Sequence, residues 1–87
     1  MQKTNSGKTI VLKYFSRFAE LTAKSSEEFK TQADTVEALW LELDSIYSFQ
    51  QPLNTVRPAI NHQFCDWTSI IDDGDTVSFI PPVSGGY

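Results

Sequence analysis

The C-terminal stretch, residues 81–87, holds the residues best suited to chemistry. It reads Pro81-Pro82-Val83-Ser84-Gly85-Gly86 and then Tyr87. Because glycine has no Cβ, a glycine pair can enter a narrow channel that is closed to other residues. The proline pair fixes φ and disfavours helix in the residue before it, which predicts an extended stem. A carboxylate at the end of such a stem is a candidate reaction site, and Tyr87 places that carboxylate one residue beyond the glycines.

The other candidates for chemistry are weaker. His62 is the only histidine and has no second ligand at zinc spacing, so no metal site is expected. Cys65 is the only cysteine, and we expect a partly buried thiol beside a surface histidine. The stretch 72–75 lacks the distal Glu of a calcium loop and predicts a turn. Intrinsic catalysis and a bound cofactor are therefore not expected.

Composition limits the class of protein. The chain has 87 residues and a net charge of −4, which predicts one domain without a basic footprint for nucleic acid. The mild acidity fits a solvated surface and a basic partner. A single cysteine favours a reducing compartment, the start lacks an apolar signal region, and no apolar stretch approaches membrane-spanning length. We therefore expect a cytoplasmic protein that binds no membrane.

Periodicity divides the chain into short elements. Alternation predicts a first strand over 9–15, with Ile10, Leu12 and Tyr14 on the core side and Phe15 on the other. In the last strand, Val77 and Phe79 share one side. The complete set of expected elements is a strand at 9–15, a short helical turn at 16–22, a polar strand at 25–32, a helix at 36–47, short strands at 56–61 and 64–67, and a last strand at 76–80.

The helix is the best-marked element. Asp34, with Glu37 three residues later, predicts an N-terminal cap of the capping-box kind. The residues that predict its buried stripe are Val36, Leu39, Leu43 and Ile46. Trp40 lies beside this stripe, which predicts a place at the periphery of the core.

The order of elements predicts an α+β protein with a β-grasp fold, a mixed sheet of about five strands packed on one main helix. The first and last strands should lie side by side and parallel at the centre of the sheet. The predicted organisation is a flexible polar N-terminus at 1–8, a β-grasp domain at 9–81 and a flexible Gly-Gly tail at 82–87.

Two apolar residues are expected on the face opposite the core. Phe15 and Ile80 should lie close together near the root of the tail if the first and last strands are neighbours. Loops covering them would be the ordinary explanation. A patch at the point where the tail departs is better interpreted as a docking surface.

With these residues in place, the sequence closely resembles the small subunit of molybdopterin synthase (MoaD-type), a ubiquitin-like sulfur carrier of the MoaD/ThiS family. The resemblance extends from about Ile10 to Gly86 and is strongest in the blocks 11–21, 35–39, 59–61 and 73–86. The last block is the most specific, since ubiquitin-like relatives share the glycine pair but rarely the Phe-Ile-Pro-Pro-Val lead-in.

The resemblance implies a mechanism. An ATP-dependent E1-like enzyme of the MoeB type would adenylate the Gly86 carboxylate, and a persulfide donor would convert it to a thiocarboxylate. Gly85 and Gly86 would then enter the large synthase subunit (MoaE-type), where sulfur passes to cyclic pyranopterin monophosphate. The chain would be the non-catalytic, sulfur-donating subunit and would itself bind no cofactor. The implied partner-binding residues are Phe15, Ile80, Pro81, Pro82, Val83 and Ser84.

Tyr87 departs from the family pattern, and three explanations compete. A processing peptidase removes it, it is an artificial addition, or the chain is a paralogue that no longer carries sulfur; we favour removal. Two other functions stay open. The chain could carry sulfur for thiamine, tRNA thiolation or another pathway, or it could be a β-grasp binding module whose tail is never activated. A weaker alternative makes Cys65 the sulfur-bearing residue.

Overall fold

The computed structural model describes residues 7–82, so most of the predicted N-terminal extension and all residues after Pro82 lie outside the described part. β1 begins at Lys8, one residue earlier than the sequence predicts. The elements are β1 (Lys8–Tyr14), α1 (Ser16–Thr22), β2 (Ser26–Thr31), α2 (Val36–Tyr47), the 3₁₀ helix η1 (Leu53–Thr55), β3 (Arg57–Ile60), β4 (Gln63–Phe64) and β5 (Thr76–Ile80).

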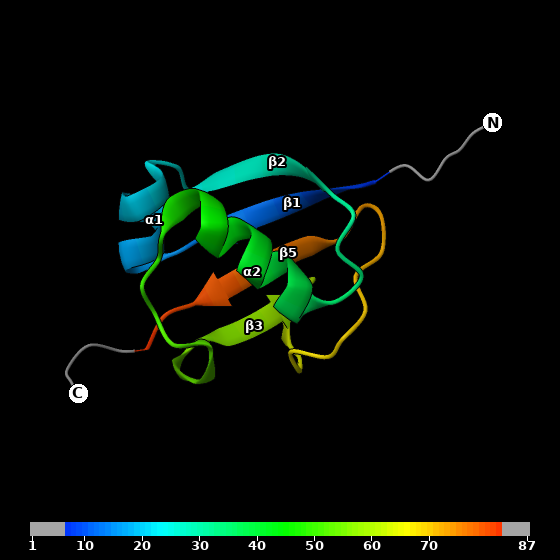
Figure 1. The fold of residues 1–87 in the computed structure, drawn as a ribbon. Helices are drawn as coiled ribbons and strands as arrows, with labels where there is room; N and C mark the ends of the chain where they lie inside the picture. Colours follow the sequence, from blue (N-terminus) through cyan, green and yellow to red (C-terminus); the bar gives the residue numbers. More distant parts are fainter. Residues whose placement is uncertain (1–6, 83–87) are drawn as a thin grey trace.

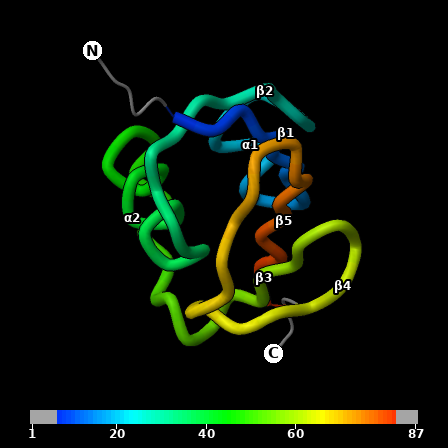
Figure 2. The backbone as a smooth tube through the Cα atoms, turned by 90° about the vertical axis from the view of Figure 1, so that its right-hand side faces the viewer, coloured from blue at the N-terminus to red at the C-terminus, as the bar shows by residue number. Residues whose placement is uncertain are grey.

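The strands form one mixed sheet in the order β2-β1-β5-β3-β4. β1 and β5 are parallel neighbours at its centre, and the other pairs are antiparallel. α2 lies across one face of the sheet (Figures 1 and 2), while α1 lies at the end of the sheet to which β5 points (Figure 1). This is the predicted β-grasp fold, which is ubiquitin-like, with one main helix on a five-stranded sheet.

η1 and β4 differ most from the sequence predictions, while β2 and β3 are each one residue shorter at both ends than predicted. η1 was not predicted, because it is a single turn without a hydrophobic period. β4 covers Gln63–Phe64 rather than 64–67. The Cys65 amide still donates to the Pro58 carbonyl oxygen at 3.1 Å, but Pro58 has no N–H to return the bond, and the chain then turns at Asp66.

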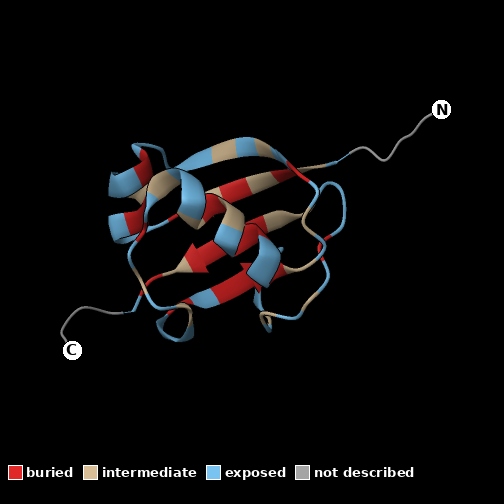
Figure 3. Cartoon of the chain, viewed as in Figure 1, coloured by how far each residue is buried: buried red, intermediate tan, exposed pale blue. Residues whose placement is uncertain are grey.

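The core lies between the sheet and α2, where buried residues concentrate on β1, β5, β3 and the inner side of α2 (Figure 3). Ile10, Leu12 and Tyr14 alternate into it as predicted. Trp40 is at its centre rather than its periphery, with 2% of its surface exposed. Its ring stacks on Phe49 with centroids 4.9 Å apart and contacts Phe79 at 5.1 Å.

The buried stripe of α2 is shifted from the predicted one. Ile46 is exposed, and Trp40 and the half-buried Tyr47 lie against the sheet instead. An α-helix turns about 100° per residue, so positions 36, 40, 43 and 47 share a face, and position 46 points nearly a quarter-turn away. The sequence prediction used only the spacing of three or four residues between apolar positions, and that spacing cannot distinguish position 46 from position 47.

The helix cap is also displaced by one residue. The Thr35 side chain accepts a hydrogen bond from the Ala38 amide at 3.2 Å, whereas the predicted cap, Asp34, pairs instead with the Lys8 ammonium at 3.1 Å. The strand-to-helix connection is fixed further by its backbone, since Asp34 accepts from the Ile71 amide. The capping prediction for Asp34 was therefore wrong, although the helix start itself was confirmed.

Candidate functional site

The root of the tail is at the centre of the sheet. β5 ends at Ile80, and Pro81 is buried while Pro82 is exposed. Because β5 runs parallel to β1, the chain leaves the sheet beside the end of β1 and the start of α1 (Figure 1). The remaining predicted tail residues lie outside the described part of the chain: Val83, Ser84, Gly85, Gly86 and Tyr87.

Phe15 and Ile80 do lie together on the sheet face opposite α2. Both line a hollow of about 190 Å³, which we call the outer hollow. Phe15 follows the last residue of β1 in extended conformation, and the chain then reverses at Ser16, whose φ is 51°. This reversal leaves the Phe15 ring 43% exposed instead of folding it under α1.

The outer hollow exists because small side chains form its floor. Ala59 on β3 pairs with Ser78 on β5, and both line the hollow. The large side chains that surround them belong to Phe15, Ile80 and Phe64. A concave apolar surface of this kind accepts a protruding side chain from another protein.

Phe64 is a residue of this surface that the sequence analysis missed. It is 59% exposed and pairs with Ala59 across the β3–β4 hairpin. The hairpin loop has two residues, Asn61 and His62, with φ of 53° and 73°, as a type I′ turn requires. The signal was available, since Asn tolerates positive φ and a two-residue loop there places Phe64 on the Ala59 side of the sheet.

Hydrogen bonds hold this hairpin against β5. The Asn61 side chain donates to the Asp75 carboxylate at 3.0 Å and accepts from the Thr76 amide at 2.9 Å. The Asn61 amide also donates to the Thr76 carbonyl oxygen at 2.7 Å. Since Asn61 fixes the loop against the start of β5, the position of Phe64 relative to Ile80 is set by the fold.

The Arg57 side chain lies against the exposed ring of Phe64. The guanidinium carbon of Arg57 lies 4.1 Å from the centroid of the Phe64 ring, a cation–π contact. Arg57 pairs with Ile80 between β3 and β5, so it adjoins the root of the tail. Beyond Phe64, a second hollow of about 550 Å³ is lined by Arg57, Phe64, Cys65, Asp66 and Ser69.

The structure gives no sign of chemistry at His62 or Cys65, the two single residues that the sequence offered as candidates. His62 lines the outer hollow and is exposed. Cys65 is half-buried, and burial raises the pKa of its thiol, so the reactive thiolate is disfavoured near neutral pH. Over residues 7–82, no group of three or more His, Cys, Asp and Glu side chains could hold a metal ion. Within the same range, no helix has the length and apolar character to cross a membrane.

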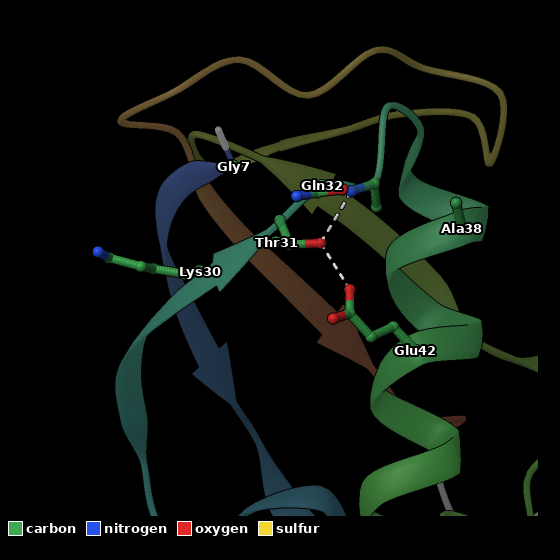
Figure 4. A pocket seen from close by; sticks show the side chains of 7 residues that line it. Gly7, Lys30, Thr31, Gln32, Ala38 and Glu42 are labelled. Atoms are coloured by element: carbon green, nitrogen blue, oxygen red, sulfur yellow. Dashed lines mark hydrogen bonds between the residues drawn. The ribbon is translucent and has the colours of Figure 1, made fainter. Parts of the chain in front are cut away.

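A larger hollow, of about 570 Å³, lies between the end of β2 and α2, at the opposite end of the sheet from the tail (Figure 4). Its one carboxylate, Glu42, already accepts a hydrogen bond from the Thr31 hydroxyl at 2.5 Å. That hydroxyl accepts in turn from the Ala33 amide at 3.0 Å. The Thr31 hydroxyl and the Glu42 carboxylate are thus bonded to each other, and no pair of groups in this hollow suggests chemistry.

Comparison with known proteins agrees with this geometry. The model of the ThiS family matches residues 12–86, and the chain therefore belongs to the ThiS family. No curated protein gives a significant match. Among solved structures, the putative molybdopterin converting factor subunit 1 from Pyrococcus furiosus is 27% identical, with a TM-score of 0.73 over 87% of this chain and 99% of that one.

Two further structures define the range of relatives. The chain is 25% identical to one in a complex of subunits 1 and 2 of the molybdopterin-converting factor from Helicobacter pylori, with a TM-score of 0.61 over 90% of this chain and 99% of that one. Small archaeal modifier protein 1 from Methanosarcina acetivorans is 17% identical and shows the shared fold, with a TM-score of 0.75 over 94% of this chain and 100% of that one. The family and fold define a small sulfur carrier or ubiquitin-like modifier.

Proposed function

We propose that this chain is the sulfur carrier subunit of a molybdopterin synthase and donates sulfur from a thiocarboxylate on Gly86 to cyclic pyranopterin monophosphate. The observation that carries the proposal is the outer hollow at the root of the tail, formed by Phe15, Phe64 and Ile80. It lies where a partner must dock if the tail is to reach an active site. Subunits named for molybdopterin conversion among the relatives support this pathway over thiamine or tRNA thiolation.

The roles within the proposed reaction divide between partners. An E1-like enzyme of the MoeB type uses ATP to form an acyl-adenylate on Gly86, because a free carboxylate is a poor electrophile. A persulfide then displaces AMP, and a thiol cleaves the resulting acyl disulfide to release the thiocarboxylate. The chain's own contribution is to dock through the outer hollow and to supply a slender tail, which the absence of Cβ atoms at Gly85 and Gly86 allows. The large subunit (MoaE-type) holds the pterin.

Tyr87 must be removed before activation in this proposal. The match to the ThiS family extends to Gly86 and leaves Tyr87 out. With Tyr87 in place, the terminal carboxylate belongs to Tyr87 rather than to Gly86. The tyrosine ring would also not fit a channel sized for glycine. We expect a processing peptidase to remove it in the cytoplasm.

Intact mass spectrometry tests the proposal directly. The full chain and a chain ending at Gly86 are incubated with the activating enzyme, ATP and a persulfide donor. We expect oxygen-for-sulfur exchange only in the shortened chain, and we expect Gly86→Ala in that chain to abolish transfer without unfolding the domain. Exchange in both chains would make Tyr87 incidental. Exchange in neither would favour a binding module, and loss of transfer in Cys65→Ser would move the chemistry to Cys65.

A second step of the same experiment separates the pathways. The thiocarboxylate form is offered to the MoaE-type subunit with cyclic pyranopterin monophosphate, and in parallel to the acceptor enzymes of thiamine and tRNA thiolation. Molybdopterin formation supports the proposed function. Sulfur transfer to one of the other acceptors, with none to the pterin, would overturn the assignment to molybdopterin while keeping the chain a sulfur carrier.

A further inference from the structure

The positive charges of this acidic chain are unevenly placed. Among the described residues, the ammonium groups of Lys8 and Lys24 are neutralised by Asp34 at 3.1 Å and Glu27 at 2.8 Å. Lys13 and Arg57 make no ion pair with any residue from 7 to 82. Both belong to strands that border the floor of the outer hollow, whereas the other two unpaired cations of the described residues, Arg17 and Lys30, lie on α1 and β2. The outer hollow is therefore flanked by two cations without a carboxylate partner among residues 7–82.

Strand pairing places Lys13 beside the outer hollow. Leu12 and Tyr14 point into the core, so Lys13 points to the outer face. Lys13 pairs with Ser78 of β5, which forms part of the hollow floor. One row of paired residues thus crosses the whole sheet on this face and contains no carboxylate: Ser26, Lys13, Ser78, Ala59 and Phe64.

Arg57 lies on the other side of the same hollow. It pairs with Ile80 and precedes Ala59 by two residues, which puts it on the outer face of β3. Its stack on the Phe64 ring, with 4.1 Å between guanidinium carbon and ring centroid, holds an otherwise mobile side chain in place. Asp66 shares the adjoining hollow with Arg57, yet no guanidinium nitrogen of Arg57 lies within 4 Å of a carboxylate oxygen of Asp66. The guanidinium therefore keeps its donors available.

We propose that the outer face recognises a partner patch in which an apolar side chain enters the outer hollow and flanking carboxylates pair with Lys13 and Arg57. This inference rests on the proposed function and specifies the chemistry of the surface that the carrier docks on. The backbones of β1 and β3 are about 10 Å apart, so the two carboxylates belong on opposite sides of the apolar side chain. Net charge alone favours a basic partner, whereas the local distribution favours an acidic one.

The occupant is a protein surface rather than a nucleic acid or a membrane. Two cations beside one apolar hollow form no stripe along which a polyanion could lie, and the chain's charge of −4 repels an extended anionic surface. An apolar pocket edged by arginine and aromatic side chains is, by contrast, the composition of energetically dominant sites in protein interfaces.

Charge-reversal variants of the full chain, and of the chain ending at Gly86, test this proposal. Binding to the MoeB-type and MoaE-type enzymes is measured by calorimetry at low and at physiological salt. We expect Arg57→Glu to weaken binding roughly tenfold or more and Lys13→Glu to weaken it by a smaller factor. Arg57→Lys, which keeps the charge and loses the stack, should have an intermediate effect. Raising the salt concentration should weaken wild-type binding more than Arg57→Glu binding.

Lys30→Glu is the matched control. Lys30 is exposed, makes no ion pair among the described residues and pairs with Thr9 on the same face. Thr9 lies four residues before Lys13, about 13 Å away along the strand. The control makes the same change in net charge and should leave affinity within about twofold. Lys13→Gln replaces Lys13→Glu if thermal unfolding shows that the reversal lowers stability.

The outcomes separate this proposal from the proposed function. Equal affinity for wild type, Arg57→Glu and Lys13→Glu would overturn the acidic-partner proposal alone, and so would equal weakening in Lys30→Glu. Binding to phosphatidylserine vesicles that Arg57→Glu abolishes, with enzyme binding unchanged, would also overturn it. Charge-dependent binding without any sulfur transfer would support it and overturn the carrier function. Absence of wild-type binding to both enzymes would overturn both.

Discussion

Aromatic side chains are buried on one face of the sheet and exposed on the other. On the face under α2, the rings of Trp40, Phe49 and Phe79 are at most 2% exposed, and the Trp40 ring contacts the other two. On the outer face, the rings of Phe15 and Phe64 are 43% and 59% exposed around a hollow with a floor of small residues. The first face stabilises the fold through its own contacts, whereas the second leaves its apolar surface exposed.

Charged groups show the same contrast. On the α2 side, the Glu27 carboxylate accepts from the hydroxyls of Tyr14 at 2.5 Å and Tyr47 at 2.9 Å, and from the Lys24 ammonium at 2.8 Å. On the outer face, the Arg57 guanidinium makes a cation–π contact with Phe64 and no ion pair among residues 7–82. A polar network that is fully satisfied supports the fold, while a cation without a carboxylate is available for recognition.

The largest loss of stability is predicted for Trp40→Ala, which tests whether the aromatic cluster under α2 stabilises the fold. The substitution removes the ring at the centre of the aromatic cluster and leaves a cavity, so we expect a loss of about 3–5 kcal/mol in the free energy of unfolding. Urea denaturation followed by circular dichroism measures it. A loss below about 1 kcal/mol would show that the cluster is not the main source of stability.

Phe64→Ala should give the opposite pattern. Because the ring is largely exposed, we expect the free energy of unfolding to change by less than about 1 kcal/mol. Affinity for the MoaE-type subunit should fall by roughly 30-fold, as for a central aromatic residue of an interface. Denaturation and calorimetry on the same sample measure both. Unchanged affinity would remove Phe64 from the docking surface, and a large loss of stability would make its role structural.

Sequence patterns were sufficient for the architecture. Alternation predicted the core face of β1, and the order of elements predicted the parallel central pair. The predicted helix cap was wrong by one residue because two neighbouring side chains could each cap the helix. Asp34 and Thr35 are both good caps, and the choice depended on Lys8, which lies 26 positions away in the chain from Asp34.

The candidate site was predictable in part, for a physical reason. Phe15 and Ile80 come together because adjacent parallel strands carry them, which strand order alone predicts. Phe64 and Arg57 depend on the conformation of a two-residue hairpin loop and on a rotamer that stacks on a ring. Neither depends on hydrophobic periodicity, so the pattern that identified the strands could not identify the complete surface.

An intermediate effect on stability is expected for Glu27→Gln, which weakens the hydrogen bonds that Glu27 accepts on the α2 side of the sheet. The contact with Lys24 and the hydroxyls of Tyr14 and Tyr47 outweigh burial and hold the pKa of Glu27 below its ordinary value of 4.5. A carboxyl group with a lowered pKa in the fold stabilises the protein above pH 4.5, and this contribution is lost as the pH falls below that value.

We therefore expect Glu27→Gln to lose about 1–2 kcal/mol at pH 7 and to show a weaker dependence of stability on pH between 3 and 5 than wild type. Urea midpoints across this range measure the difference. Glu28→Gln is the control, because Glu28 is an exposed neighbour on β2. The same pH dependence in wild type and Glu27→Gln would show that another carboxylate governs acid sensitivity.

The smallest effect concerns the start of α2 and tests the cap that the sequence misplaced. Thr35→Ala removes the acceptor of the Ala38 amide, which should cost about 1 kcal/mol in the free energy of unfolding. Asp34→Ala removes only a surface ion pair whose carboxylate is 84% exposed, so its cost should be a few tenths of a kcal/mol. Urea denaturation of both variants at pH 7 measures the difference. A larger loss for Asp34→Ala than for Thr35→Ala would restore Asp34 as the cap. Neither change should alter docking, because both lie at the end of the sheet remote from the tail.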